Sequence, residues 1–221
     1  MSKTMLKKIL IISLTLVIIL GVSFYFYFQQ RETKEGEEDK SSSSPFANAR
    51  ELEDLAKNHP EGEKYLSEIL EAKKKLKDRN KTNDIEALNS IGVNLNILGA
   101  KEKALKYYQK TLKLNPQNLL ALNNIANIYN DLSQYDLAEK YFLKLIDFYP
   151  ENPFFWRSIA DLYRYRLNKS QKEIEDFFKQ GLEKTNYHPD LITWLISYFE
   201  EIGNNEKFVE YSNLLIEKSK Q

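Results

Sequence analysis

The chain has 221 residues, enough for one domain and an attachment segment. Lysine plus arginine and aspartate plus glutamate each number 32, so the formal net charge is zero. General nucleic-acid binding, which needs a basic excess, is therefore not expected. The absence of cysteine excludes disulfides, thiolate metal sites and cysteine nucleophiles.

The N-terminal stretch predicts a membrane anchor. The segment Ile9–Phe28 carries no charged residue, and a helix of that length spans about 30 Å, the thickness of a bilayer core. A cleaved signal peptide is the alternative, but its apolar core would be shorter and a site of small residues would follow it. Here the sequence FYFYFQQRE follows. We therefore expect residues 1–28 to form a short tail and an uncleaved transmembrane helix.

Basic residues on either side of this segment set its expected orientation. Three lysines precede it, whereas the basic residues that follow lie among many acidic ones: Lys3, Lys7 and Lys8 against Arg31, Lys34 and Lys40. The positive-inside rule then favours a cytoplasmic N-terminus. We expect a single-pass protein of the cell membrane with its body outside the cytoplasm, which in a bacterium is the periplasm or the outer face of the membrane.

A linker and two helices are expected next. Residues 29–44 are charged and then serine-only, without apolar periodicity, which is typical of a flexible linker. Residues 45–84 are expected to hold N-terminal helices that pack on the following domain, over 46–57 and 61–77. The second of these helices carries its apolar residues on one face.

A period of 34 residues then runs through the chain. It relates residues of matched size and polarity in eight columns. These are Leu88, Leu122 and Trp156; Ile91, Ile125 and Ile159; Gly92, Ala126 and Ala160; Leu95, Tyr129 and Tyr163; Gly99 and Ser133; Ala104 and Ala138; Tyr108 and Phe142; Pro116 and Pro150. A period of this length is typical of stacked helical hairpins, which present binding surfaces.

Each period predicts two helices and a tight turn. We expect helices over 85–98, 101–114, 119–132 and 135–148, followed by one that starts at Pro153. Gly99 permits the first turn, and Asn118 and Asn152 are the expected helix caps. The repeat units of the domain 85–221 are then 85–118, 119–152, 153–188 and 189–221.

The pattern of small, aromatic and proline positions resembles the tetratricopeptide repeat (TPR) family. Small residues stand where the two helices of a hairpin cross, with Gly92 near Ala104 and Ala126 near Ala138, and large ones fill the space between hairpins. The match is specific over 85–152 and looser through the third and fourth units. The resemblance implies an all-α, TPR-type α-solenoid of stacked helical hairpins, preceded here by one N-terminal transmembrane helix.

The third and fourth units depart from the pattern. After Tyr163 the register slips by two, which predicts two extra residues in the turn around 168–170. Ser170 and Glu173 then form an expected capping box. The linker to the fourth unit is also expected to be longer, reaching Pro189. In that unit Ile196 replaces the small residue, which suits a terminal cap.

The resemblance also places a binding groove on the first helix of each hairpin. Its implied lining residues are Asn89, Val93, Asn96, Asn123, Asn124, Asn127, Asn130, Arg157, Asp161, Arg164, Thr193, Ser197 and Glu200. An asparagine amide both donates and accepts, so it can pair with the backbone of an extended peptide. The alternative is that asparagine is common throughout this chain and tolerated on wet helix faces. A carboxylate clamp of the co-chaperone type is not expected, because Asn89 and Phe154 stand where its lysines belong.

Catalysis is not expected. The two histidines, His59 and His188, each lie beside a proline and lack a second ligand at helical spacing. There is no glycine-rich phosphate loop or nucleophile elbow. We therefore expect no catalytic residue, metal, cofactor or small-molecule substrate.

The sequence predicts a membrane-anchored scaffold or adaptor that binds other proteins or extended peptides at the membrane surface. A chaperone-like role for exported chains is one form of this function. The alternative is a permanent structural subunit of an envelope, secretion or pilus assembly.

Overall fold

The computed structural model describes residues 47–76 and 81–220, and within these ranges all regular secondary structure is helical. The main chain divides into two units, 1–50 and 51–221, and only the start of α2 represents the first unit among the described residues. The predicted membrane segment 9–28 and linker 29–44 lie outside the described residues. None of the described helices combines the length and apolarity needed to cross a bilayer.

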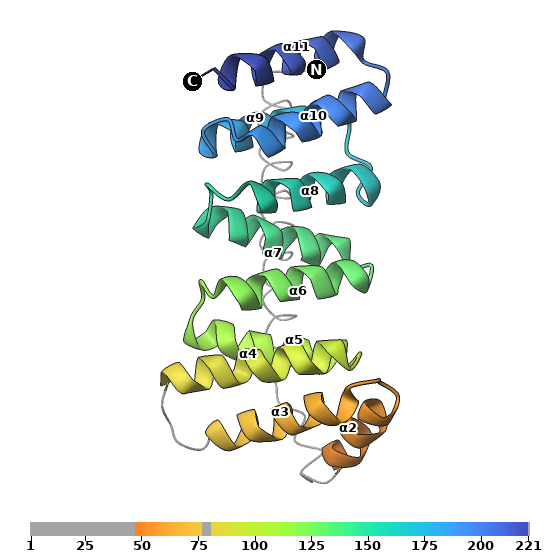
Figure 1. Cartoon of the computed structure of the whole chain (residues 1–221), viewed down its shortest axis with the longest axis vertical. Coiled ribbons are helices and arrows are strands. Elements are labelled where there is room, and N and C mark those ends of the chain that lie inside the picture. Colours follow the sequence, from red (N-terminus) through yellow and green to blue (C-terminus); the bar gives the residue numbers. More distant parts are fainter. Residues whose placement is uncertain (1–46, 77–80, 221) are drawn as a thin grey trace, which may run out of the picture. The chain divides into compact units, whose positions relative to one another are not determined.

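The helices of the second unit stack as successive hairpins (Figure 1). They follow α2 (Ala47–Lys57) and are α3 (Gly62–Lys75), α4 (Lys81–Ile97), α5 (Lys101–Leu114), α6 (Leu119–Asp131), α7 (Tyr135–Phe148), α8 (Pro153–Tyr165), α9 (Gln171–Lys184), α10 (Pro189–Glu201) and α11 (Asn205–Lys218). Each of the pairs α4–α5, α6–α7, α8–α9 and α10–α11 packs together, and α3 packs on α4. First helices also meet across hairpins, α4 with α6 and α8 with α10. The predicted all-α solenoid of hairpins is confirmed.

Helix ends agree closely with the sequence pattern. The helices predicted over 101–114 and 135–148 have those limits, and α8 begins at Pro153 as expected. The predicted caps are also present, since Asn118 accepts a hydrogen bond from the Ala121 amide and Asn152 accepts one from the Phe154 amide. The first repeat helix, α4, begins at Lys81, ahead of the predicted 85.

A left-handed residue closes the first helix of three hairpins. Its backbone φ is positive at Gly99 (82°), Ser133 (58°) and Gly203 (72°). The next amide then reaches five residues back, as in the 2.8 Å bond from Ala100 to the Leu95 carbonyl. This is the Schellman arrangement, which satisfies a terminal carbonyl and reverses the chain.

The turn of the third hairpin is longer. Residues 166–170 separate α8 from α9, whereas residues 98–100 and 132–134 suffice in the first two hairpins, so the predicted two-residue extension is confirmed. The predicted capping box between Ser170 and Glu173 is also present with both of its bonds. The prediction of a longer linker before Pro189 is wrong. Residues 185–188 are as many as 149–152, because the extended turn alone accounts for the slip.

The repeat columns form the core. Ile91, Ile125 and Ile159 are all fully buried. At Gly92, an added Cβ would lie 2.6 Å from the Tyr108 ring. The sequence interpretation paired Gly92 with Ala104, but the atoms nearest to the missing Cβ belong to Tyr108. The small residue therefore makes room for an aromatic ring of the second helix.

Candidate protein-binding groove

The first helices α4, α6 and α8 contribute residues to two hollows, and the surface that carries these hollows is hereafter called the groove. The central hollow, of about 320 Å³, lies between α6 and α8. Its lining comes from both helices, from α7 behind them and from the turn after α8: Asn127, Asn130, Phe142, Ser158, Asp161, Leu162, Tyr165 and Arg166. Three of the predicted groove residues, Asn127, Asn130 and Asp161, therefore line one cavity.

The N-terminal hollow lies between α3, α4 and α6. Its volume is about 360 Å³, and its lining residues are Glu68, Glu86, Asn89, Ser90, Val93, Asn94 and Leu120. Asn89 and Val93 were implied by the TPR resemblance. Glu68 could not be implied in this way, because α3 lies outside the repeat. Hollows on successive hairpins give the groove room for several side chains of one ligand.

Two of the groove asparagines already use their side-chain amide groups as donors within α6. The Asn124 amide donates to the Leu120 carbonyl at 2.8 Å, and the Asn127 amide donates to the Asn123 carbonyl at 2.9 Å. Among the four asparagines of α6, Asn127 is the exposed one. Four side-chain oxygens of the groove asparagines are covered and receive no hydrogen bond from the described residues: those of Asn89, Asn96, Asn123 and Asn130. Asn127 is therefore the amide placed to meet a ligand first.

Two of the three predicted charged residues of α8 bind the fourth hairpin. Asp161 accepts a hydrogen bond of 2.8 Å from the indole nitrogen of Trp194 in α10. The Arg164 guanidinium pairs with Glu201 and lies 5.1 Å from the centre of the Tyr198 ring. These contacts occupy the space between α8 and α10. Arg157 is exposed on α8.

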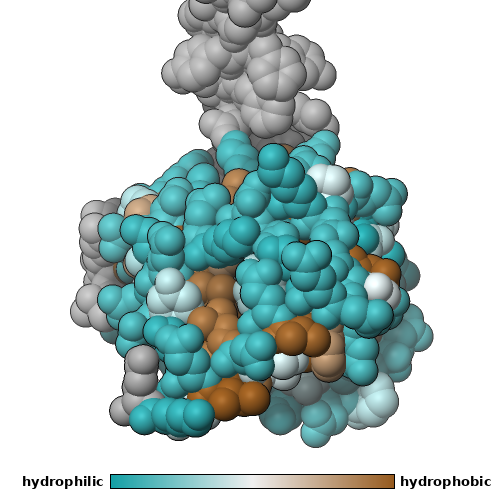
Figure 2. All heavy atoms as spheres, turned by 90° about the horizontal axis from the view of Figure 1, so that it is seen from above, coloured by the Kyte–Doolittle hydropathy of each residue, from teal (hydrophilic) through white to brown (hydrophobic). Residues whose placement is uncertain are grey.

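Beyond the groove, apolar side chains reach the surface at the last helix. Figure 2 looks down onto the molecule from above and shows a mostly polar surface interrupted by apolar patches. In the α10–α11 hairpin about half of the surface of three apolar residues is exposed: 43% for Ile202, 52% for Val209 and 53% for Ile216. Nothing in the described residues covers them.

Two family models match the chain, over 85–118 and over 107–140, and both describe a tetratricopeptide repeat. Residues 85–140 of the chain therefore match the tetratricopeptide-repeat family. Both matched ranges lie within α4–α7, the part in which the sequence pattern is most regular. The predicted resemblance to this family is confirmed over these residues.

Solved TPR-like structures share the fold. A MamA from Desulfovibrio magneticus RS-1, residues 41 to the end, has a TM-score of 0.52 and 14% identity, covering 78% of this chain and 95% of that chain. Another MamA structure has a TM-score of 0.54 and 13% identity, with coverages of 78% and 92%. A TPR protein from Parabacteroides merdae ATCC 43184 has a TM-score of 0.55 and 20% identity, with coverages of 78% and 67%. At these identities the likeness concerns the fold alone. No curated protein matches the chain by sequence.

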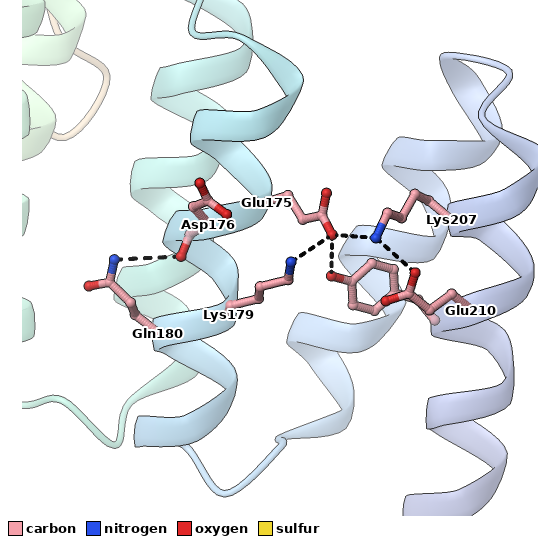
Figure 3. A network of polar contacts seen from close by, with 7 residues as sticks. Glu175, Asp176, Lys179, Gln180, Lys207 and Glu210 are labelled. Atoms are coloured by element: carbon pink, nitrogen blue, oxygen red, sulfur yellow. Dashed lines mark hydrogen bonds and ion pairs between the residues drawn. The ribbon is translucent and has the colours of Figure 1, made fainter.

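A polar network joins α9 to α11 at the end of the TPR domain (Figure 3). The Glu175 carboxylate accepts hydrogen bonds from Tyr211 at 3.1 Å, Lys207 at 2.8 Å and Lys179 at 3.1 Å. Burial acts to raise the pKa of Glu175, but the hydrogen bonds from the two lysines outweigh it and the pKa is lowered. Lys207 also pairs with Glu210 at 2.8 Å. The described residues include no group of acidic or histidine side chains arranged to hold a metal ion.

Proposed function

We propose that this TPR protein is a scaffold that binds extended segments of partner proteins along the groove of α4, α6 and α8. TPR solenoids present extended concave surfaces for such binding. The observation that carries the proposal is the pair of hollows, which lie on consecutive hairpins and contain predicted groove residues of each.

Anchoring at the membrane completes the proposal. Its support is the sequence alone, in which Ile9–Phe28 is uncharged and long enough to span a bilayer. The TPR domain then lies outside the cytoplasm, where a groove that binds extended chains would receive exported proteins in a chaperone-like way. The chain has no cysteine. A single cysteine at exposed Glu183 therefore tests the orientation, because a membrane-impermeant maleimide should label it in intact cells.

Photo-crosslinking in cells tests the binding surface. A photoreactive amino acid replaces Asn127 in the full chain, and a matched variant carries it at Asp147, which is exposed on the second helix of the same hairpin. A range of unfolded or extended partners captured from Asn127 and not from Asp147 supports the groove. One dominant partner captured equally from both positions would instead identify a permanent assembly subunit and reject the groove.

A further inference from the structure

The N-terminal hollow has a chemical character of its own. Two carboxylates line it, Glu68 from α3 and Glu86 from α4, and the described residues that line it include no lysine or arginine. Glu68 is held in place because its Oε2 accepts a 3.0 Å hydrogen bond from the amide of Asn94, a residue only 4% exposed. A carboxylate has about four acceptor positions, so this bond leaves Glu68 able to accept from a ligand.

Two apolar side chains also line the hollow, beside the polar Asn89, Ser90 and Asn94. Val93 lies on the α4 side, and Leu120 approaches from α6 and is 39% exposed. An alkyl chain placed here would cover part of Leu120 and bury apolar surface. The hollow therefore joins an apolar wall to a negative end.

One side-chain oxygen in the hollow also lacks a hydrogen-bond donor among the described residues. The Asn89 side chain lines the hollow and donates to Asn118, but its Oδ1 is covered and receives no hydrogen bond from any described residue. A covered acceptor without a partner is unfavourable. A small rotation of this amide would let it accept an N–H from a ligand within the hollow.

We propose that the N-terminal hollow binds an arginine side chain from an extended segment of a partner protein. This inference rests on the proposed function and adds the chemistry of the ligand. The arginine stem lies along Leu120 and Val93, and the guanidinium pairs with Glu68 and Glu86. Arginine is preferred to lysine, because its planar group has five N–H donors and can also reach the Asn89 oxygen.

Binding to immobilised peptides tests the proposal with the full chain in detergent. The peptides have a randomised mixture of Ala, Ser, Leu and Asn on both sides of a central arginine, lysine, citrulline or leucine. Citrulline keeps the shape of arginine and removes its charge. We expect the arginine set to retain roughly fivefold more protein than the citrulline set, with the lysine set between them. Equal retention of the arginine and citrulline sets would overturn the proposal.

Charge-neutral variants locate the site. Glu86→Gln combined with Glu68→Gln should bring arginine retention down to the citrulline value, and the glutamine oxygen introduced on α3 can still accept from Asn94. Glu183→Gln, an equal change at an exposed position on α9, should leave the preference for arginine intact. A preference that survives the double variant would place arginine binding elsewhere. Absence of binding to every peptide set, together with no capture from Asn127, would count against the proposed function as well.

Discussion

The first two hairpins (85–152) and the last two (153–218) build the same crossing with different residues. In the first two, a small residue of the first helix faces an aromatic ring of the second: Gly92 with Tyr108, and Ala126 with Phe142 at the equivalent positions. The third hairpin keeps this order with Ala160 and Phe178. The fourth reverses it, with Ile196 on the first helix and Ser212 on the second.

A second pair of positions shows the same exchange of volume. The residues are Leu122 with Leu145 in the second hairpin, but Trp156 with Gly181 in the third. A Cβ added at Gly181 would lie 2.8 Å from the Trp156 ring, so the large and small residues are in contact. The repeat therefore keeps the combined volume of two facing side chains similar, and the larger side chain can lie on either helix of the hairpin.

The two halves also differ in the contacts between hairpins. In the first half, an ion pair of 2.7 Å between Lys101 and Asp131 links the hairpins at a partly exposed site. In the second half, Trp194 stacks on Phe178 with ring centres 4.5 Å apart and donates to Asp161. Aromatic and charged side chains thus fill the junction of α8 with α10, whereas both hollows of the groove lie between α3 and the turn that follows α8. We therefore expect ligands to bind mainly to the first three hairpins.

The strongest test of volume exchange is a double-mutant cycle at Trp156 and Gly181. Gly181→Leu should lower the free energy of unfolding by about 3 kcal/mol through overpacking against the indole. Trp156→Leu should lower it by about 3 kcal/mol by leaving a cavity. The double variant restores the leucine pair of the second hairpin, so it should be at least about 2 kcal/mol more stable than the sum of the two losses predicts. Urea denaturation followed by circular dichroism measures all four proteins.

The control for this cycle combines Gly181→Leu with Leu88→Ala in the first hairpin. The helices that carry these sites, α4 and α9, do not contact each other in the described part of the chain, so the two effects should add within about 0.5 kcal/mol. If the losses of stability at Trp156 and Gly181 are also additive, the two side chains do not fill one common space. The idea that the hairpins exchange volume between facing positions is then wrong.

Local patterns in the sequence account for most of the helix limits. Gly99 before α5 and the prolines that follow α5 and α7, Pro116 and Pro150, act within one repeat together with the apolar periodicity, so these helices could be placed to the residue. The first turn of α4, from Lys81 to the predicted start at residue 85, was not predicted, because no proline or glycine marks a helix boundary there. The longer linker expected before Pro189 is absent, because the two extra residues in the turn after α8 already explain the register slip.

Fewer features of the groove than of the helices could be predicted from the sequence. The repeat pattern identifies which face of a first helix is turned to the groove, as for Asn89 and Asn127. It does not encode contacts between hairpins, so the engagement of Asp161 by Trp194 was missed. Glu68 was also missed, because α3 lies before the repeats and carries no signal that relates it to α4.

The contribution of the charged network at the C-terminal end can be tested at Glu175. Glu175→Gln should lower the free energy of unfolding by about 2 kcal/mol near neutral pH, since the hydrogen bonds from Lys179, Lys207 and Tyr211 lose the negative charge of their acceptor. The pKa of this carboxyl is lowered in the folded protein, below its usual 4.5, because the lysine bonds outweigh burial. Its stabilisation is therefore present above the unfolded-state pKa and is lost as the pH falls through the folded-state value. Denaturation at pH 7 and at about pH 3 measures this change.

The difference between wild type and Glu175→Gln should thus shrink in acid. Glu183→Gln on the same helix provides the matched control, because Glu183 is exposed and an exposed carboxylate contributes little. A Glu175→Gln effect of equal size at both pH values would show that shape, and not charge, makes Glu175 important.

The smallest expected effect concerns the turns, where the hairpins differ by one residue type. Ser133 adopts a left-handed φ of 58°, whereas the equivalent residues Gly99 and Gly203 are glycines with φ of 82° and 72°. A left-handed conformation costs a residue with a Cβ about 1–2 kcal/mol, and glycine loses part of this advantage through its greater freedom when unfolded. Ser133→Gly should therefore raise the free energy of unfolding by about 0.5–1 kcal/mol.

Gly99→Ser, the reverse change in the first hairpin, should lower the free energy of unfolding by a similar amount. Space is not limiting, because a Cβ at Gly99 would meet nothing within 4 Å. The hydrogen bond of 3.2 Å between Tyr135 and Ser133 is exposed, so its loss in Ser133→Gly should take away little. Opposite signs at the two turns, measured in the same urea denaturation, would assign the effect to the backbone. Equal signs would mean that the serine side chain, and not its φ, sets the stability of the second turn.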